Sequence, residues 1–198
     1  MLHLSTYIKE RNMELVYPIT DRDKLNTMAK YLKEHNYRDY VMFEVGINLG
    51  IRVSDFSQQK VGFYREAVNK GYVYMIAQKQ KKKVMVAMSK ELQLLILDYI
   101  KDKSDEQWMF ESRKAGAPLT RVQIYRILND AADYAGIEDN IGCHSMRKTF
   151  GYWHYYYNKD IRLLMEIFNH SREEVTLRYI GVTADQIKKS AEVMNLGL

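Results

Sequence analysis

The chain has 198 residues and a formal net charge of +5 at pH 7, a basic balance that favours anionic partners; its length favours one domain over two. The single cysteine, Cys143, excludes an intramolecular disulfide framework and a multi-cysteine metal site. No stretch reaches the roughly 20 apolar residues that span a bilayer, and the N-terminus lacks a secretory pattern. These features predict a soluble, cytoplasmic protein without a membrane partner.

The first fifty residues contain two helical patterns after a weakly periodic start. Residues 1–19 are expected to be a lead-in or a linker. Thr20, three residues before an aspartate, resembles a capping box and predicts the start of a helix. A second helix is predicted over Tyr37–Gly50, because glycine is a good helix end. Arg52 follows at once, so we expect it at a helix terminus near the core, where its charge needs a partner.

A basic hairpin is expected next. Two β-like runs, Tyr72–Ile76 and Val84–Met88, flank the stretch Gln78–Lys83, which reads as the hairpin tip. A tip this basic can lie along a phosphate backbone, where released counterions drive binding. Lys79 lies at the strand end and not in the middle of the turn, which makes it the better candidate to protonate a leaving oxygen.

The rest of the chain is predicted to be helical. Residues Ser89–Ile100 form an amphipathic pattern, and Thr120 caps a helix expected over Arg121–Ala135. Breaks are expected near Asn158 and Asn169. The order of helices, a small sheet and further helices predicts a mostly helical α+β domain.

The last segment is expected to carry a short helix and a final one. Ser171, three residues before a glutamate, resembles a capping box for a short helix that ends with Tyr179 before Gly181. A chain can pivot at that glycine, which would help a nucleophile approach and leave. A last helix is predicted from Thr183 to about Asn195.

One set of side chains suits the breaking and remaking of a phosphodiester: Arg52, His144, Arg147, His170 and Tyr179. Arginine stays charged and offers two donors to non-bridging oxygens. Tyrosine can hold a phosphate covalently, and histidine can move protons. Taken singly, each has an ordinary explanation, since a His-x-x-Arg pattern is common and the chain has 16 tyrosines. No phosphate-binding loop or His-Glu-x-x-His motif is present, so neither ATP nor a catalytic metal is implied, and no cofactor is expected.

In order and spacing, these residues resemble the catalytic domain of the tyrosine recombinases, also called the phage integrase family. The segment Leu49–Asp55 is similar to the family's first-arginine motif, His144–Phe150 to its His-x-x-Arg box, and Phe168–Tyr179 to its terminal box. Asn169 stands where the family usually has glycine, a mild change because both residues allow the turn. The resemblance implies that residues 20–198 form a tyrosine-recombinase-like catalytic domain with a small antiparallel hairpin.

The resemblance implies a site-specific recombinase that cleaves and rejoins DNA through a 3′-phosphotyrosine intermediate, without metal or ATP. The implied catalytic residues are Arg52, Lys79, His144, Arg147, His170 and Tyr179. Lys81 is the alternative to Lys79 as general acid, and Asp55 is expected to steady the arginines. The expected DNA contacts are Lys81, Lys82, Lys83, Thr120, Arg121 and Lys148.

The implied partner is double-stranded DNA with a specific recombination site. The protein is expected to form a homo-multimer on DNA, a tetramer in the synapse, through its C-terminal helix, with accessory DNA-bending proteins as further partners. Family members usually carry an N-terminal domain that completes a DNA clamp. Only about 20 residues precede the matching region here, so the chain is similar to short members such as the fimbrial inversion recombinases, or is a fragment.

Two other functions stay open at this point. A topoisomerase of the type IB kind would nick and reseal DNA without exchanging partners. A non-catalytic DNA-binding regulator would keep the fold but have no catalytic activity. The intact set of catalytic residue types favours an enzyme over the regulator, and a C-terminal docking helix favours the recombinase over the topoisomerase.

Overall fold

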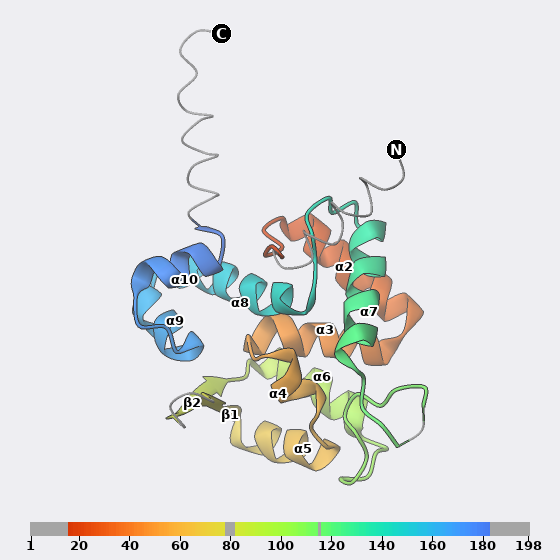
Figure 1. Ribbon diagram of the computed structural model, residues 1–198. Helices are drawn as coiled ribbons and strands as arrows, with labels where there is room; N and C mark the ends of the chain where they lie inside the picture. Colours follow the sequence, from red (N-terminus) through yellow and green to blue (C-terminus); the bar gives the residue numbers. More distant parts are fainter. Residues whose placement is uncertain (1–15, 78–81, 115, 183–198) are drawn as a thin grey trace, which may run out of the picture.

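The helix α3 (Tyr37–Leu49) lies at the centre of the molecule (Figure 1). It contacts α2 (Arg22–His35), α6 (Lys90–Ile100) and α8 (Cys143–Asn158). Five of its side chains are fully buried: Val41, Met42, Phe43, Val45 and Leu49. A helix that is apolar on most sides is expected to be surrounded by other elements, as this one is.

The computed structural model describes residues 16–77, 82–114 and 116–182. The other elements are α4 (Val53–Ser57), α5 (Val61–Lys70), β1 (Tyr72–Ala77), β2 (Lys82–Ala87), α7 (Arg121–Tyr134), α9 (Ile161–Phe168) and α10 (Glu173–Tyr179). This arrangement confirms a mostly helical domain with a small antiparallel sheet. Within the described ranges, no helix is long and apolar enough to cross a membrane.

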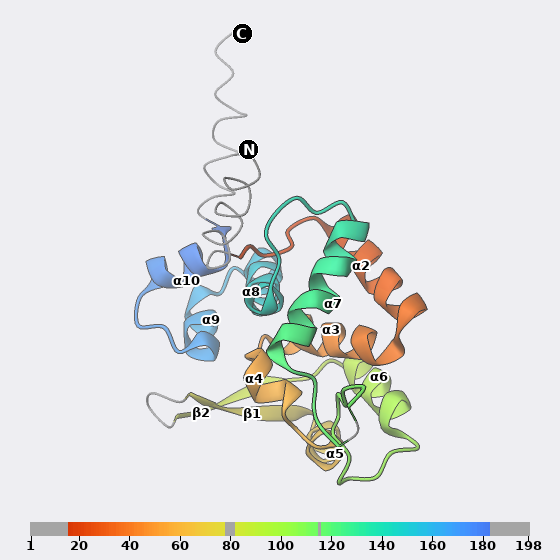
Figure 2. The same cartoon turned by 45° about the vertical axis from the view of Figure 1, so that its right-hand side comes forward.

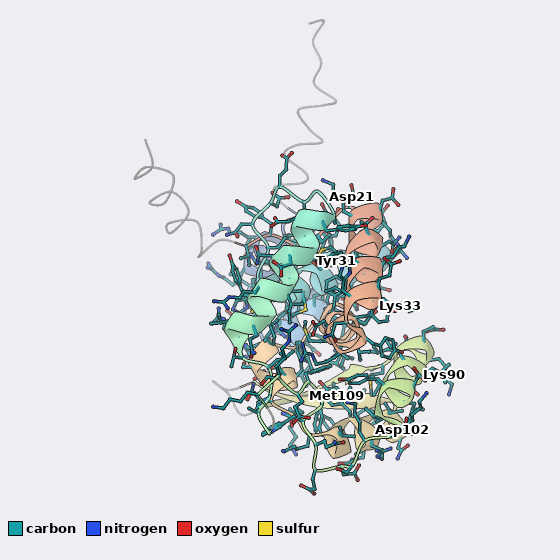
Figure 3. All side chains as sticks on the ribbon, turned by 90° about the vertical axis from the view of Figure 1, so that its right-hand side faces the viewer. Asp21, Tyr31, Lys33, Lys90, Asp102 and Met109 are labelled. Carbon is teal, nitrogen blue, oxygen red and sulfur yellow. The ribbon has the colours of Figure 1, made fainter. Side chains whose placement is uncertain are left out.

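The helices α2 and α7 lie side by side on one flank of the molecule (Figure 3). Tyr31 of α2 lies between them, and its ring centroid is 4.6 Å from that of Tyr134 on α7. On the opposite flank, α9 and α10 pack against each other, and α9 packs on α8 (Figures 1 and 2). The C-terminal half of the chain therefore supplies helices to both flanks of the molecule, and α8 connects them to the central helix.

The two strands form an antiparallel pair that extends beneath α9 (Figure 2). The hairpin was expected, but its tip is shorter than the predicted Gln78–Lys83. Lys82 and Lys83 belong to β2 and pair with Ala77 and Ile76 of β1. The error came from treating consecutive lysines as a turn, although their backbone can still form ladder hydrogen bonds. Lys79 and Lys81 lie outside the described residues.

Two predicted helix caps are wrong and a third is confirmed. The N-cap of α2 is Asp21 and not Thr20, because the Asp21 carboxylate accepts hydrogen bonds from the N–H groups of Asp23 (2.8 Å) and Lys24 (3.1 Å). The N-cap of α10 is Arg172, which makes no side-chain cap, so the capping box predicted at the preceding serine does not form. Thr120 caps α7 in a capping box with Gln123, as expected.

The breaks predicted near Asn158 and Asn169 are confirmed. The helix α8 ends at Asn158, and Lys159 follows in the left-handed conformation with φ 56°. Asn169 ends α9 with the same φ of 56°. Asparagine tolerates this conformation better than most residues, so the chain can reverse there without a glycine.

Candidate active site

Arg147 forms the buried centre of the candidate site. It lies in the second turn of α8, is only 5% exposed, and donates hydrogen bonds to the carbonyl oxygens of Gly50 (2.5 Å) and Ile167 (3.5 Å). Its guanidinium carbon lies 4.3 Å from the ring centroid of Phe168. The side chain thus joins the end of α3 to the end of α9. A charge this buried needs such partners.

The turn after α3 determines where both arginines lie. Gly50 has a φ of +59°, and a Cβ at this position would lie 2.2 Å from the Phe150 ring of α8. Only glycine combines that conformation with so close an approach. The turn directs the Gly50 carbonyl to Arg147 and places Arg52, two residues later, as the N-cap of α4.

Arg52 lies at a helix terminus and has a partner, as the sequence predicted, although the terminus is the start of α4 and not the end of the preceding helix. Its Nη1 atom lies 3.7 Å from Oδ2 of Asp55, one turn later in α4. The other carboxylate oxygen of Asp55 accepts a hydrogen bond from the Ser54 hydroxyl (3.2 Å). The Arg52 side chain is 38% exposed, so an anion can reach it.

His170 is positioned by two hydrogen bonds after the break at Asn169. Its backbone N–H donates to the Met165 carbonyl (2.9 Å), and its Nδ1 atom lies 3.0 Å from the Thr176 hydroxyl. Thr176 is fully buried in α10 and was missed by the sequence analysis. Its place three residues before Tyr179, on the same face of a short helix, is a signal that could have identified it.

Tyr179 is the last residue of α10, and three side chains surround its ring. The rings of Phe168 and His170 each lie 5.4 Å away between centroids, edge to face, and the Lys148 ammonium lies 5.2 Å from the centroid. Burial raises the pKa of the Tyr179 hydroxyl, while hydrogen bonding to Arg147 and the charges of Arg147 and Arg52 act to lower it. The tyrosine therefore lies within the field of both arginines.

Both histidines have pKa values below the usual range. For His144, whose side chain keeps access to solvent, desolvation by the neighbouring protein atoms is the main cause of the lowered pKa, followed by the charges of Arg121 and Lys148. For His170, burial also comes first, followed by the charges of Arg147 and Arg52. A lowered pKa favours the neutral imidazole at neutral pH, and a neutral imidazole can accept or donate a proton.

Among the described residues, the structure brings together the side chains that the sequence marked for phosphodiester chemistry; Lys79 lies outside the described residues. Arg52, Arg147, His170 and Tyr179 influence one another electrostatically, while His144 is exposed at the start of α8 and senses both arginines. Sequence separation had hidden this proximity.

The expected DNA contacts have different surroundings. Lys83 and Arg121 are exposed, and the Thr120 hydroxyl serves the helix cap described above. Lys148 is partly buried, and its ammonium donates a hydrogen bond to the Val16 carbonyl (2.6 Å). DNA binding by these residues stays a prediction.

The described part of the chain offers no ready metal site. No group of three or more histidine, cysteine, aspartate or glutamate side chains lies close enough there to hold a metal ion. Cys143 is buried, and its thiol lies 3.4 Å from the Arg121 carbonyl.

Sequence comparison identifies the class of protein. The model of the phage integrase family matches residues 19–186, so the chain belongs to that family. It is 38% identical over 181 residues to the probable integrase/recombinase YoeC of Bacillus subtilis, covering 91% of this chain and 98% of that protein. It is 30% identical over 167 residues to the tyrosine recombinase XerH of Campylobacter jejuni, covering 81% of this chain but only 46% of XerH.

Solved structures share the fold. A crystal structure of the XerA recombinase superposes with a TM-score of 0.67 at 21% identity, over 84% of this chain and 58% of that one. A lambda integrase dimer bound to a COC′ core site gives a TM-score of 0.64 at 15% identity, over 84% and 60% of the two chains. The family supports site-specific DNA recombination as the general activity.

Proposed function

We propose that this protein cleaves and rejoins DNA at a specific site through a covalent 3′-phosphotyrosine link formed by Tyr179. The observation that carries the proposal is the position of the Tyr179 ring, which lies against His170 and within the field of Arg147 and Arg52. A nucleophile, two fixed cations and a proton carrier are the parts that phosphodiester transfer requires.

In the proposed reaction the Tyr179 oxygen attacks the phosphorus, and the bond from phosphorus to the 5′ oxygen breaks. The phenol proton passes to a neutral imidazole, with His170 the nearer of the two to the Tyr179 ring. The departing 5′ oxygen receives a proton from Lys79. Rejoining reverses these steps with a new 5′ hydroxyl, so the covalent link conserves the bond and no nucleotide is required.

The arginines act on the charge that develops in the transition state. Arg147 is preorganised, because its contacts with Gly50 and Ile167 fix the guanidinium before DNA arrives. Arg52 is more exposed and completes the pair. Fixed donors aimed at developing charge are typically the largest catalytic term, and removing one costs about 10²- to 10³-fold in rate.

The same proposal covers the extent of the catalytic domain, the DNA partner and the assembly of subunits. Residues 20–198 act as the catalytic domain and residues 1–19 as a lead-in. The partner is double-stranded DNA, on which subunits assemble into a tetramer through the segment from Thr183 onward, which lies outside the described residues. Arg121 and the hairpin lysines hold the DNA backbone. Accessory DNA-bending proteins assist assembly.

A covalent trapping experiment tests this function. The protein is incubated with a library of random-sequence duplexes, each carrying a nick that lets the cleaved end diffuse away. Adducts are then captured under denaturing conditions. We expect adducts with the wild-type protein and none with Tyr179→Phe, which keeps the ring and removes only the nucleophilic oxygen. Absence of wild-type adducts, or adducts that survive Tyr179→Phe, would refute the proposal. The recovered duplexes identify the site, and pairing two of them tests strand exchange against simple relaxation.

A further inference from the structure

Lys148 connects the candidate nucleophile to the start of the domain. It follows Arg147 in α8, and its ammonium donates a hydrogen bond to the Val16 carbonyl (2.6 Å). The same ammonium lies 5.2 Å from the centroid of the Tyr179 ring. Burial lowers the pKa of the Lys148 amine, which is consistent with an amine taken partly out of water.

The segment of residues 16–19 is fixed along α8 by further hydrogen bonds. The Ile19 N–H donates to the Thr149 hydroxyl (2.9 Å), and the Trp153 indole N–H donates to the Ile19 carbonyl (3.0 Å). The Tyr17 N–H donates to the Asn140 carbonyl (3.0 Å) just before α8. The Val16 carbonyl is therefore a fixed acceptor that holds the Lys148 ammonium in place.

The same segment reaches the turn that follows the nucleophile. Gly181 has a φ of +79°, and a Cβ there would lie 2.9 Å from Cγ of Pro18. The ring of Tyr179 itself is enclosed by the rings of Phe168 and His170 and by the Lys148 ammonium. A cation over an aromatic face restricts where the ring can move, and the attraction strengthens when the phenol ionises because the ring gains electron density.

We propose that Lys148 is a positioning residue for Tyr179, and that the segment of residues 16–19 supports the nucleophile through it. The inference rests on the proposed function, because it assigns the tyrosine a nucleophilic role. Lys148 acts through the tyrosine ring and not through a DNA phosphate, since its ammonium already donates to a fixed carbonyl oxygen. Lys148 would then be a further residue of the proposed active site, in addition to the groups that bind the phosphate or carry protons.

Two roles for Lys148, positioning of Tyr179 and contact with a DNA phosphate, predict different results in DNA-binding and rate measurements. A lysine that binds a phosphate contributes to the salt dependence of DNA affinity, and removing it reduces the salt slope by about 1. A lysine that positions the tyrosine leaves that slope unchanged and changes the rate of the covalent step. Misplacement of a reacting group by about 1 Å can reduce a rate by about 10²-fold.

The experiment compares Lys148→Met and Lys148→Arg with a matched control, Lys103→Met. The control removes an ammonium that lies 4.5 Å from the Tyr99 ring centroid, just after α6, a helix that carries no residue of the candidate site. Each protein is given a duplex recovered by covalent trapping, and three quantities are measured. These are the rate of adduct formation at saturating protein, the salt slope of DNA binding, and the ¹⁹F resonance of Tyr179 in protein labelled with 3-fluorotyrosine. The Tyr179 resonance is assigned by its loss in Tyr179→Phe.

We expect Lys148→Met to slow adduct formation about 10- to 100-fold with an unchanged salt slope. The Tyr179 resonance should shift or broaden while the other tyrosine resonances stay in place, which shows that the variant is folded. Lys148→Arg should retain most of the rate, because a guanidinium also stacks on aromatic rings and donates to carbonyls. Lys103→Met should match the wild type.

Two results would overturn the inference. One is a salt slope reduced by about 1 in Lys148→Met together with an unchanged rate at saturation, which is the signature of a phosphate contact. The other is a Tyr179 resonance that Lys148→Met leaves untouched. If the wild-type protein forms no adduct with any duplex, the proposed function fails, and the resonance alone still decides whether Lys148 fixes the ring.

Discussion

Arg147 shows how much of a residue's role depends on its surroundings. The sequence indicated an arginine three residues after a histidine in a helix. It did not indicate that the guanidinium would be almost fully buried and hydrogen-bonded to two carbonyl oxygens from distant helices. Those carbonyls come from Gly50 and Ile167, and no local pattern relates either of them to Arg147. The chemistry of the side chain was predictable, whereas its rigidity was not.

Thr176 provides a test of how His170 is oriented. Thr176→Val keeps the shape of the side chain and removes the hydroxyl that contacts Nδ1 of His170 at 3.0 Å. The imidazole loses its fixed orientation, so we expect the rate of adduct formation to fall about tenfold, a fraction of what a positioned acid or base contributes. Thr176→Ser should restore the rate, because it restores the hydroxyl.

The readout for Thr176 must exclude a general loss of structure. The pH profile of the single-turnover rate should change in Thr176→Val and return to the wild-type profile in Thr176→Ser, whereas a purely structural role would leave its shape unchanged. An unaltered rate and profile in Thr176→Val would contradict the assignment. Thermal unfolding of both variants provides the stability control.

The choice between Lys79 and Lys81 as general acid can be tested with a modified substrate. A duplex whose leaving 5′ oxygen is replaced by sulfur needs no proton donor, because a thiolate is a good leaving group. We expect the general-acid variant to cleave ordinary DNA at least about 10²-fold more slowly and to regain near wild-type cleavage on the sulfur duplex. Lys79→Ala should behave in this way and Lys81→Ala should not. Rescue of Lys81→Ala alone would reverse the assignment.

At the scale of elements, two glycines allow α8 to approach its neighbours closely. A Cβ on Gly46 of α3 would lie 2.4 Å from the Met146 sulfur of α8. A Cβ on Gly151 of α8 would lie 2.6 Å from Ile180 and 2.7 Å from the Phe168 ring. These approaches bring α8, which carries Arg147, against α3 and against the ends of α9 and α10, the last of which carries Tyr179. The sequence showed the glycines but not what they face.

Replacing these two glycines by alanine should have unequal effects. Both lie inside helices, where alanine alone would stabilise by roughly 0.5–1 kcal/mol. Gly151→Ala introduces a methyl group against an aromatic ring and a branched side chain, so we expect a net loss of about 1–3 kcal/mol in the free energy of unfolding, measured by urea denaturation. Gly46→Ala, the matched control, meets a flexible methionine and should lose less. Equal losses in Gly151→Ala and Gly46→Ala would contradict the prediction, because they would show that the side chains around Gly151 move aside as easily as the methionine at Gly46.

Some elements were predictable and others were not, for physical reasons. The helix from Arg121 was predicted with its cap because a threonine is a good N-cap residue, and the structure adds a glutamine three residues later that completes the capping box locally. The short helices α4 and α5 were not predicted. Phe56, Val61 and Tyr64 are buried in them through contacts with the rest of the core, which local periodicity over so few residues does not reveal. Tertiary packing decides such elements.

At the scale of the whole molecule, stability should fall as the pH drops below about 6.5. The pKa values of His144, His154 and His170 are lowered in the folded state, chiefly by burial, from an unfolded value of about 6.5. Between the folded and unfolded values, the unfolded chain binds more protons, so acid favours unfolding. Asp39 and Glu44, whose pKa values burial raises, act in the opposite sense at lower pH.

This dependence can be measured by urea denaturation at about pH 7.5 and about pH 5.5, on either side of the unfolded histidine pKa. We expect a smaller free energy of unfolding at the lower pH. His154→Gln should reduce the difference in free energy of unfolding between the two pH values, because it removes a histidine whose pKa is lowered in the folded state. This histidine lies outside the proposed catalytic set, and its buried Nδ1 atom has no hydrogen-bond partner in the described structure. Equal or greater stability at the lower pH would contradict the prediction.

The sequence by itself determined the class of fold, the order of most helices, the basic hairpin and the residue types of the candidate site. These follow from local periodicity, turn chemistry and the distinctive chemistry of arginine, histidine and tyrosine. Only the tertiary structure decided that Thr176 supports His170, that Lys148 contacts both Val16 and the ring of Tyr179, and that Arg147 is buried between two helix ends. Such contacts join residues far apart in the chain or depend on side-chain direction, and no local pattern encodes either.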